Sequence, residues 1–237
     1  MKKFFASIFV GLLTAGAALS EQAQQVSADQ ILEAMRDMTV SQENKDVLGS
    51  IRKGRNKIPF SLSARGETIV FQYKVNNAWQ RFDVRIKEKN VDLIRVTNGK
   101  AQIMAPASYA TPIADTDVCY EDLSLRFLYW KGGKLIEDSA NARIKGRDCY
   151  IVEVANPTPS VGQFAWVRMW VDKENGTSWQ IDGYGKDGKL KKRFSITSVQ
   201  RLDDGTWFFK QMKLEVRDPK NPDRNTAINY IDMQDLK

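Results

Sequence analysis

The sequence DVCYEDLSLRFLYW, residues 117–130, is the clearest amphipathic segment of the chain. The carboxylate of Asp117 can accept hydrogen bonds from the unpaired amides at a helix start, and the acidic residues that follow favour the positive end of the helix dipole. Apolar residues then recur at helical spacing, namely Leu123, Phe127, Leu128 and Trp130. We therefore predict a central helix that ends at residues 131–133, where Lys-Gly-Gly interrupts the pattern.

A helix with this much aromatic surface needs a large apolar surface to lie on. Two roles are compatible with the pattern. The helix is either part of an ordinary core, or a lid over an apolar cavity. The sequence leaves both open.

On both sides of this segment the hydrophobic period changes to two, which is typical of strands. The runs that fit are residues 58–64, 69–75, 79–86, 93–97, 101–104, 134–144, 149–154, 164–171, 178–184, 190–202, 207–216 and 226–233. Tight turns are predicted at Asn76-Asn77 and Asn98-Gly99, because Asn and Gly tolerate the left-handed conformation. We predict a mainly β (α+β) fold with one strongly curved or barrel-like antiparallel sheet.

Few other helices are expected. Ser27 and Gln30 form a capping-box pattern at the start of a helix that should end near Asp37. Residues 45–51 are predicted to form a short helical turn. No boundary divides the chain, so residues 21–237 are expected to form a single domain.

The N-terminus has the pattern of a secretory signal. Lys2 and Lys3 precede an apolar run at residues 4–19 that is short for a membrane span, and Ser20 closes a small-x-small cleavage pattern. We predict a signal peptide at residues 1–20, cut after Ser20, and a periplasmic protein. No cysteine follows the apolar run, so no lipid anchor is expected.

The composition excludes several functional classes. The 237 residues contain no histidine, which excludes Ser-His-Asp and Cys-His catalysis and imidazole metal sites. The net charge of +7 is spread among interleaved acids and bases, so nucleic-acid binding is not predicted. The adjacent carboxylates at residues 121–122 and 137–138 point in different directions and suit no acid–base pair. We expect no enzyme activity, cofactor or metal.

The two cysteines, Cys119 and Cys149, are predicted to form a disulfide in an oxidising compartment. The bridge would close a loop of about 30 residues and would be worth roughly 3–4 kcal/mol in the chain-entropy model. The alternative is a pair of buried free thiols.

Several short motifs occur in an order that resembles a known family. They are YEDL at residues 120–123, GRDCY at 146–150, WVDK at 170–173, GY at 183–184 and DGKLK at 187–191. From Ser27 to the C-terminus the chain resembles the bacterial outer membrane lipoprotein-sorting proteins, relatives of the periplasmic carrier LolA and its partner LolB. The resemblance implies an unclosed β-barrel of about eleven strands with a helical lid. It also implies acyl-chain cargo, an inner-membrane donor complex and an outer-membrane acceptor.

An acyl chain offers no hydrogen-bonding groups, so its site requires shape and apolar area. Methionine and aromatic side chains suit such cargo. The candidate cavity-lining residues are Met35, Met38, Phe71, Tyr73, Phe82, Leu123, Phe127, Trp166 and Trp170. The sequence predicts a periplasmic carrier for lipoproteins or other lipidic cargo. The alternative is an interaction module that docks on an envelope complex and carries nothing, which a tightly packed interior or an exposed Trp79–Trp130 patch would favour.

Overall fold

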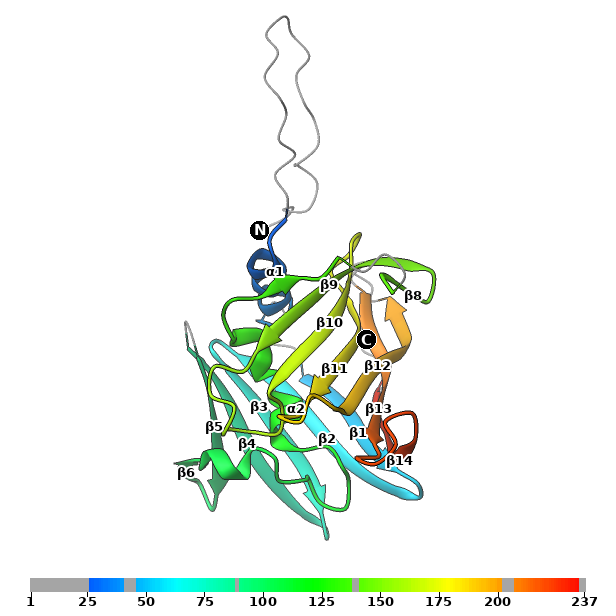
Figure 1. Cartoon of the computed structure of the whole chain (residues 1–237). Coiled ribbons are helices and arrows are strands. Elements are labelled where there is room, and N and C mark those ends of the chain that lie inside the picture. The colour runs from blue at the N-terminus through cyan, green and yellow to red at the C-terminus, as the bar shows by residue number, and fades with distance from the viewer. Residues whose placement is uncertain (1–25, 41–45, 88–89, 138–140, 202–206, 235–237) are drawn as a thin grey trace, which may run out of the picture.

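The computed structural model describes residues 26–40, 46–87, 90–137, 141–201 and 207–234, except for the side chains of residues 38–40, 201, 207 and 208. The predicted signal peptide and its cleavage site lie outside the described residues. The described residues form a fourteen-stranded antiparallel sheet with few helices, shown in Figure 1. The mainly β, unclosed fold is therefore confirmed, with fourteen strands in place of the expected eleven.

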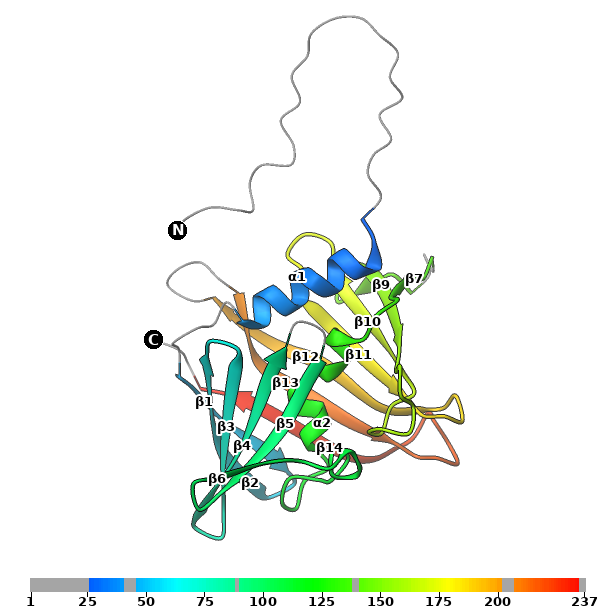
Figure 2. The same ribbon diagram turned by 90° about the vertical axis from the view of Figure 1, so that its left-hand side faces the viewer.

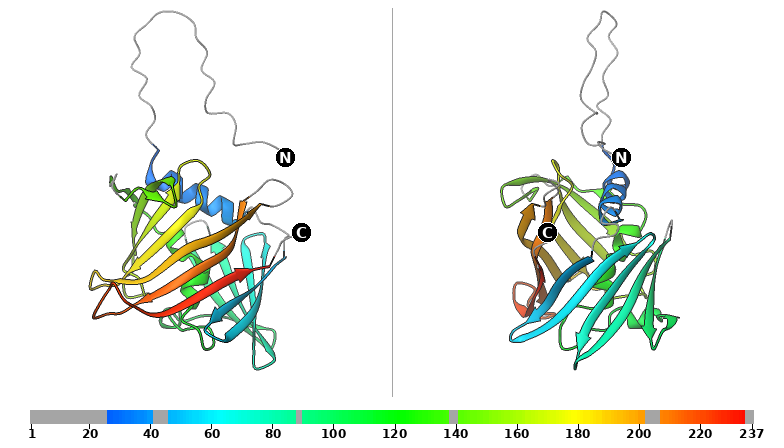
Figure 3. Two further views of the ribbon diagram at one scale, coloured as in Figure 1. Left: turned by 90° about the vertical axis from the view of Figure 1, so that its right-hand side faces the viewer. Right: turned by 180° about the vertical axis from the view of Figure 1, so that it is seen from behind.

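The sheet has two halves that meet where the first strand of the chain pairs with the last. The first half contains β1 (Asp46–Lys53), β2 (Asn56–Arg65), β3 (Thr68–Val75), β4 (Ala78–Lys87), β5 (Asn90–Thr97) and β6 (Lys100–Ile103). The second half contains β7 (Lys134–Leu135), β8 (Arg143–Ile144), β9 (Arg147–Ala155), β10 (Trp166–Asp172), β11 (Ser178–Tyr184), β12 (Leu190–Arg201), β13 (Trp207–Arg217) and β14 (Asn225–Met233). The sheet order is β6-β5-β4-β3-β2-β1-β14-β13-β12-β11-β10-β9-β7, with β8 paired to β9. The whole sheet curves around an interior without closing (Figures 2 and 3).

The predicted tight turns are confirmed. Asn76 and Asn77 join β3 to β4 with φ of 49° and 62°, and Asn98 and Gly99 join β5 to β6 with φ of 51° and 74°. These left-handed conformations match the right-handed twist of the flanking strands. The hairpins set the register in which Phe71 lies opposite Phe82.

The first helix, α1 (Ala28–Val40), begins with the predicted capping box. The Ser27 amide donates to Gln30 Oε1 (2.9 Å), and the Gln30 amide donates to Ser27 Oγ (3.2 Å). Its apolar face is buried and consists of Ala28, Ile31, Leu32 and Met35. In Figure 2, α1 crosses the open side of the curved sheet. No helix in the described residues is long and apolar enough to span a membrane.

The prediction of one helix over residues 117–130 is wrong. The segment forms a five-residue helix, α2 (Tyr120–Ser124), and a 3-10 turn, η2 (Arg126–Tyr129), separated by Leu125 in the left-handed region at φ 47°. A further 3-10 turn, η1 (Pro106–Ser108), precedes them. Packing inside the curved sheet stabilises this break, because a left-handed Leu is disfavoured on its own.

Two local predictions fail for related reasons. The α2 cap is Cys119 together with Asp122, and Asp117 instead binds groups on neighbouring strands. The helical turn predicted at residues 45–51 is a strand, because β1 is paired on both sides by β2 and β14. Tertiary pairing overrides weak local preference here.

Candidate functional site

An apolar cavity of about 340 Å³ lies between the concave face of the sheet and the helical segments. Its helical side is formed by Met35 of α1 and by residues 122–125, 127 and 128 of α2 and η2. Its sheet side is formed by side chains of β1–β3 and β11–β14. They include Val47, Phe60, Leu62, Phe71, Ile181, Phe194, Ile196, Phe209, Met212, Ile231 and Met233. The volume falls in the range of small-molecule pockets, which are about 300–1,000 Å³.

A row of aromatic rings runs across β2–β4 and reaches the cavity wall at Phe60 and Phe71. Phe60 stacks on Phe71 with centroids 4.9 Å apart, and Phe71 stacks on Phe82 at 5.1 Å. Tyr120 of α2 meets Phe82 edge-on at 5.0 Å, and its hydroxyl lies 2.9 Å from that of Tyr73. The cavity therefore ends at Phe71 on this side, because Tyr120 covers the next rings.

The structure brings four of the predicted lining residues together at the cavity. They are Met35, Phe71, Leu123 and Phe127. Tyr73 and Phe82 are buried in the adjoining core, and Phe82 is fully buried. The side chain of Met38 lies outside the described part of the chain. Whether any of these residues binds a ligand stays a prediction.

The structure does not place the predicted residues Trp166 and Trp170 on the cavity wall. Trp170 is buried in a second cluster with Cys149 and Ile151, and its Nε1 donates to the Asn141 carbonyl (2.8 Å). Trp166 stacks on Tyr184 at 3.5 Å. Both lie on the convex face of β10, whereas the inward face carries Val167, Met169 and Val171.

Several lining residues were not nominated from the sequence. Met212, Met233, Phe194 and Phe209 lie on β12–β14, which were predicted as strands without a choice of inner face. The signal that identifies them is alternation combined with pairing register. Met212 and Phe194 lie on the same face because Ile196 pairs with Met212 and Phe194 pairs with Leu214.

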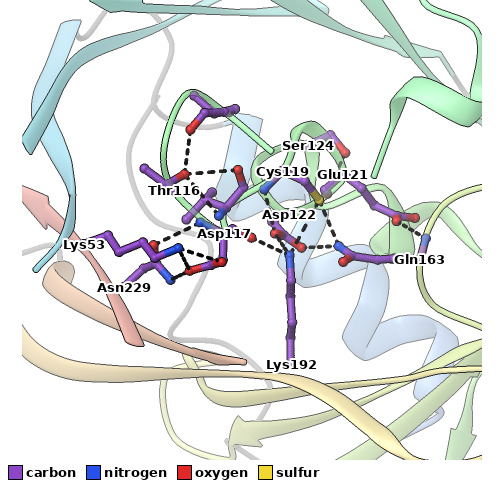
Figure 4. A network of polar contacts seen from close by, with 12 residues as sticks. Lys53, Thr116, Asp117, Cys119, Glu121, Asp122, Ser124, Gln163, Lys192 and Asn229 are labelled. Atoms are coloured by element: carbon purple, nitrogen blue, oxygen red, sulfur yellow. Dashed lines mark hydrogen bonds and ion pairs between the residues drawn. The ribbon is translucent and has the colours of Figure 1, made fainter. Parts of the chain in front are cut away.

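A buried ion pair fixes α2 to the sheet beneath it (Figure 4). Lys192 Nζ on β12 donates to Asp122 Oδ2 (2.6 Å) and to the Asp117 carbonyl (2.7 Å). The Asp122 side chain is 0 % exposed and that of Lys192 is 9 % exposed. Burial alone lowers the pKa of Lys192, but the charge of Asp122 opposes it and the net pKa is raised. The ammonium therefore stays charged although it is buried.

The neighbouring carboxylate, Glu121, is also fully buried, and it shares one partner residue, Gln163, with Asp122. Arg126 Nη1 donates to Glu121 Oε1 (3.0 Å), and the backbone amide of Gln163 donates to Glu121 Oε2 (2.6 Å). Burial raises the pKa of Glu121 despite these donors. Gly162 has φ 82°, and a Cβ there would collide with the Glu121 carboxylate, so only glycine allows the loop this close.

Asp117 ties the start of this segment to two strands. Its carboxylate accepts from Lys53 Nζ (2.9 Å) and from Asn229 Nδ2 (2.8 Å), and its own amide donates to Asn229 Oδ1 (3.1 Å). Burial would raise the pKa of Asp117, but the hydrogen bonds from Asn229 and Lys53 outweigh it and the pKa is lowered. The role predicted for Asp117 as a helix cap is replaced by this tether.

The predicted disulfide is wrong, because Cys119 and Cys149 are both free and buried. Cys119 lies on the concave side, where Gln163 Nε2 is 2.9 Å from its sulfur. Cys149 lies in the convex-face cluster with Ile151 and Trp170. The sheet separates the two sulfurs, and burial raises the pKa of both thiols.

The helix α1 is held over the cavity by contacts with η2 and the turn after it. Arg36 Nη1 donates to the Leu128 carbonyl (2.6 Å), and its guanidinium lies 5.8 Å from the Tyr129 ring centre. The Gly133 amide donates to Asp29 Oδ1 (3.1 Å). The helix therefore rests on the cavity through few polar contacts and one apolar face.

The arrangement provides burial of apolar surface, and its two adjacent carboxylates are engaged in ion pairs. Glu121 and Asp122 are each paired with a cation of their own, Arg126 and Lys192, so they do not form an acid–base couple. Asp138, in the other pair considered, lies outside the described residues. Within the described ranges no cluster of metal-ligating side chains occurs.

Comparison with known proteins yields one family model and several similar structures. The model, described as "Uncharacterized protein", matches residues 98–235. No curated protein matches the chain.

Three solved structures show the shared fold. A domain named for outer membrane lipoprotein sorting, from Vibrio parahaemolyticus, has a TM-score of 0.65 at 13 % identity over 89 % of this chain and 92 % of its own. A DUF1329 family protein from Desulfovibrio piger has a TM-score of 0.66 at 19 % identity over 89 % and 91 %. A LolA superfamily protein from Nitrosomonas europaea has a TM-score of 0.66 at 16 % identity over 90 % and 93 %. At these identities the similarity concerns the fold alone.

Proposed function

The chain belongs to the family whose model covers residues 98–235 and has a LolA-like fold, and we propose on this basis that it is a periplasmic carrier. It holds the acyl chains of lipoproteins or another lipidic cargo in its cavity and passes them towards the outer membrane. A donor complex at the inner membrane and an acceptor at the outer membrane complete this proposal. Export through the signal peptide at residues 1–20 is part of it.

The observation that carries the proposal is the apolar cavity of about 340 Å³ beneath α1 and η2. Cores usually fill such space, since interiors pack as densely as organic crystals. An acyl chain would recover the lost contacts, and each buried methylene contributes about 0.8 kcal/mol. That increment corresponds to roughly fourfold in affinity per methylene.

The first test is gentle purification from the native periplasm, followed by native mass spectrometry and organic extraction. A co-purifying lipid or acylated protein would identify the cargo class. In parallel, displacement of a fluorescent fatty acid by saturated chains of increasing length should show affinity rising about fourfold per methylene until the cavity is full. A flat length dependence, or failure to bind any chain, would contradict a carrier.

A matched pair of variants links binding to the cavity. Leu123→Trp adds bulk at a lining position, whereas Leu48→Trp makes the same change at a convex-face position that is 48 % exposed. We expect Leu123→Trp to weaken fatty-acid binding at least tenfold and Leu48→Trp to leave it unchanged. Equal binding by both variants would place the ligand elsewhere.

The alternative of a docking module rests on a different surface. Trp130 is 4 % exposed, so it forms no surface patch with Trp79. Trp79 is 56 % exposed and Ile103 is 63 % exposed, on β4 and β6 near one edge of the sheet. If the purified protein is empty and takes up no fatty acid, this edge becomes the surface to test for a protein partner.

A further inference from the structure

The sheet wall is interrupted beside the cavity. Strand β11 pairs with β12 from Tyr184↔Leu190 to Gln180↔Ser195, whereas β12 continues to Arg201 and pairs there only with β13 in the described part. The neighbouring hairpin of β10 and β11 ends at its turn, so it does not extend along β12 beyond Ser195. The edge of β12 after Ser195 therefore has backbone groups that no strand on the β11 side satisfies.

Lys145, from the turn between β8 and β9, covers this edge. Its Nζ donates to the carbonyls of Ile196 (2.7 Å) and Thr197 (3.2 Å) and lies 5.9 Å from the Trp179 ring centre. An ammonium has three N–H donors, and these two bonds use two of them. Both acceptors are neutral, so the charge of Lys145 is not cancelled by them.

A second pocket, of about 450 Å³ and with three charged residues in its lining, opens at the same place. Its lining comprises Lys145, Arg147, Glu174, Asn175, Thr177, Trp179 and Val199. Thr177 and Val199 also line the apolar cavity. The apolar cavity and the pocket with the charged residues thus lie against the same two residues, an arrangement that suits the tail and the head of an amphiphile.

Arg147, the other cation of this pocket, is engaged by two carboxylates. Arg147 Nε donates to Asp172 Oδ2 (2.7 Å), and Arg147 Nη2 donates to Glu174 Oε2 (2.8 Å). Asp172 also accepts from Trp179 Nε1 (2.9 Å), and its pKa is lowered by the hydrogen bonds from Arg147 and Trp179, which outweigh burial. Asp172 does not line the pocket, so the three charged residues of the lining, Lys145, Arg147 and Glu174, carry a net charge of +1.

We propose that this pocket binds the anionic headgroup, a carboxylate or a phosphate, of an amphiphile whose acyl chain occupies the cavity. The proposal rests on the carrier function above and names its ligand class. The third N–H of Lys145 meets the headgroup oxygen, and the bonds to Ile196 and Thr197 hold the ammonium in place. Because the site is exposed, the charge preference is modest and depends on salt.

The test compares four ligands with the same twelve-carbon chain below their micellar concentrations: dodecanoate, dodecyl phosphate, dodecanol and dodecyltrimethylammonium. The wild-type protein should bind the two anions about fivefold more tightly than dodecanol, as expected for a partly exposed charge pair. The relative affinity of dodecanoate and dodecyl phosphate then distinguishes a fatty acid from a phospholipid source. The preference should shrink at high salt.

Variants of one lysine assign the preference to this pocket. Lys145→Gln should lose the preference while still binding dodecanol, and Lys145→Arg should keep it. Lys189→Gln is the matched control, because Lys189 also donates to a backbone carbonyl, that of Pro219, beyond the opposite end of β11.

The outcomes separate this inference from the carrier function. Equal wild-type affinity for dodecanoate and dodecanol, or a preference that persists in Lys145→Gln, would overturn the headgroup site alone. Failure to bind any of the four ligands would overturn the carrier function itself. The wild-type comparison stands even where a variant fails to fold.

Discussion

Replacing Lys192 by Met should destabilise the protein strongly, because it leaves the Asp122 carboxylate buried without a cation. The Asp122 side chain is 0 % exposed, and Lys192 provides its charged partner at 2.6 Å. Removing one member of a buried ion pair typically lowers the free energy of unfolding by roughly 3–5 kcal/mol. Asp122 keeps the amide of Cys119 and the side chain of Gln163 as donors, so we expect about 3 kcal/mol, at the lower end of that range.

The double variant separates the pair from its surroundings. Asp122→Asn together with Lys192→Met removes both charges and keeps an acceptor for the Cys119 amide. We expect it to recover about half of the loss, about 1.5 kcal/mol, which lies within the interaction energies of about 0.5–3 kcal/mol found for residues in contact.

Urea unfolding followed by tryptophan fluorescence measures these free energies, with the slope of the transition checked for each variant. Lys191→Met is the matched control, since the neighbouring Lys191 forms an exposed pair with Asp187 worth about 0–1 kcal/mol. If Lys192→Met and Lys191→Met differ by less than about 1 kcal/mol, the buried pair does not anchor α2 and the reasoning is refuted.

Three further predictions address pH, the first helix and the thiols. Because burial raises the pKa of Glu121 above its ordinary 4.5, protonation stabilises the fold, and this contribution is lost as the pH rises from 4.5 through the raised pKa. As the pH rises through this range, the wild type should therefore lose stability that Glu121→Gln keeps, so the difference between their free energies of unfolding should shift in favour of the variant. Parallel stability curves would contradict this. Arg36→Met removes the charge-assisted bond to the Leu128 carbonyl, so amide exchange in α1 should accelerate about tenfold, whereas unchanged exchange would show that the bond does not hold the helix. Alkylation of the protein unfolded without reductant should add two labels, and a disulfide would give none.

The periodic parts of the fold were predictable from the sequence because their determinants are local. Alternation of apolar residues identified β2–β4, and the Asn76-Asn77 turn identified the hairpin between β3 and β4. The capping box at Ser27 and Gln30 placed the start of α1 and therefore its buried face. These features depend on contacts between residues close in the chain, which a single sequence displays.

The inner face of the sheet was decided only by tertiary structure. On β10 both faces carry large apolar residues, and a period of two cannot say which faces inward. Trp170 is turned outward because Ile136, Ala142 and Ile144 cover it on the convex side. The same ambiguity explains the missed residues on β12–β14 and the wrong pairing of Cys119 with Cys149.

The sequence by itself determined the strand-rich fold, its turns and the concentration of apolar residues at 117–130. Only the tertiary structure decided how that segment is used. The break at Leu125, the Lys192–Asp122 pair and the tether of Asp117 to Asn229 join residues 70 to 112 positions apart or depend on packing around them. Long-range partners of this kind leave no mark in the local pattern, because their free energy comes from burial inside a sheet that must already be assembled.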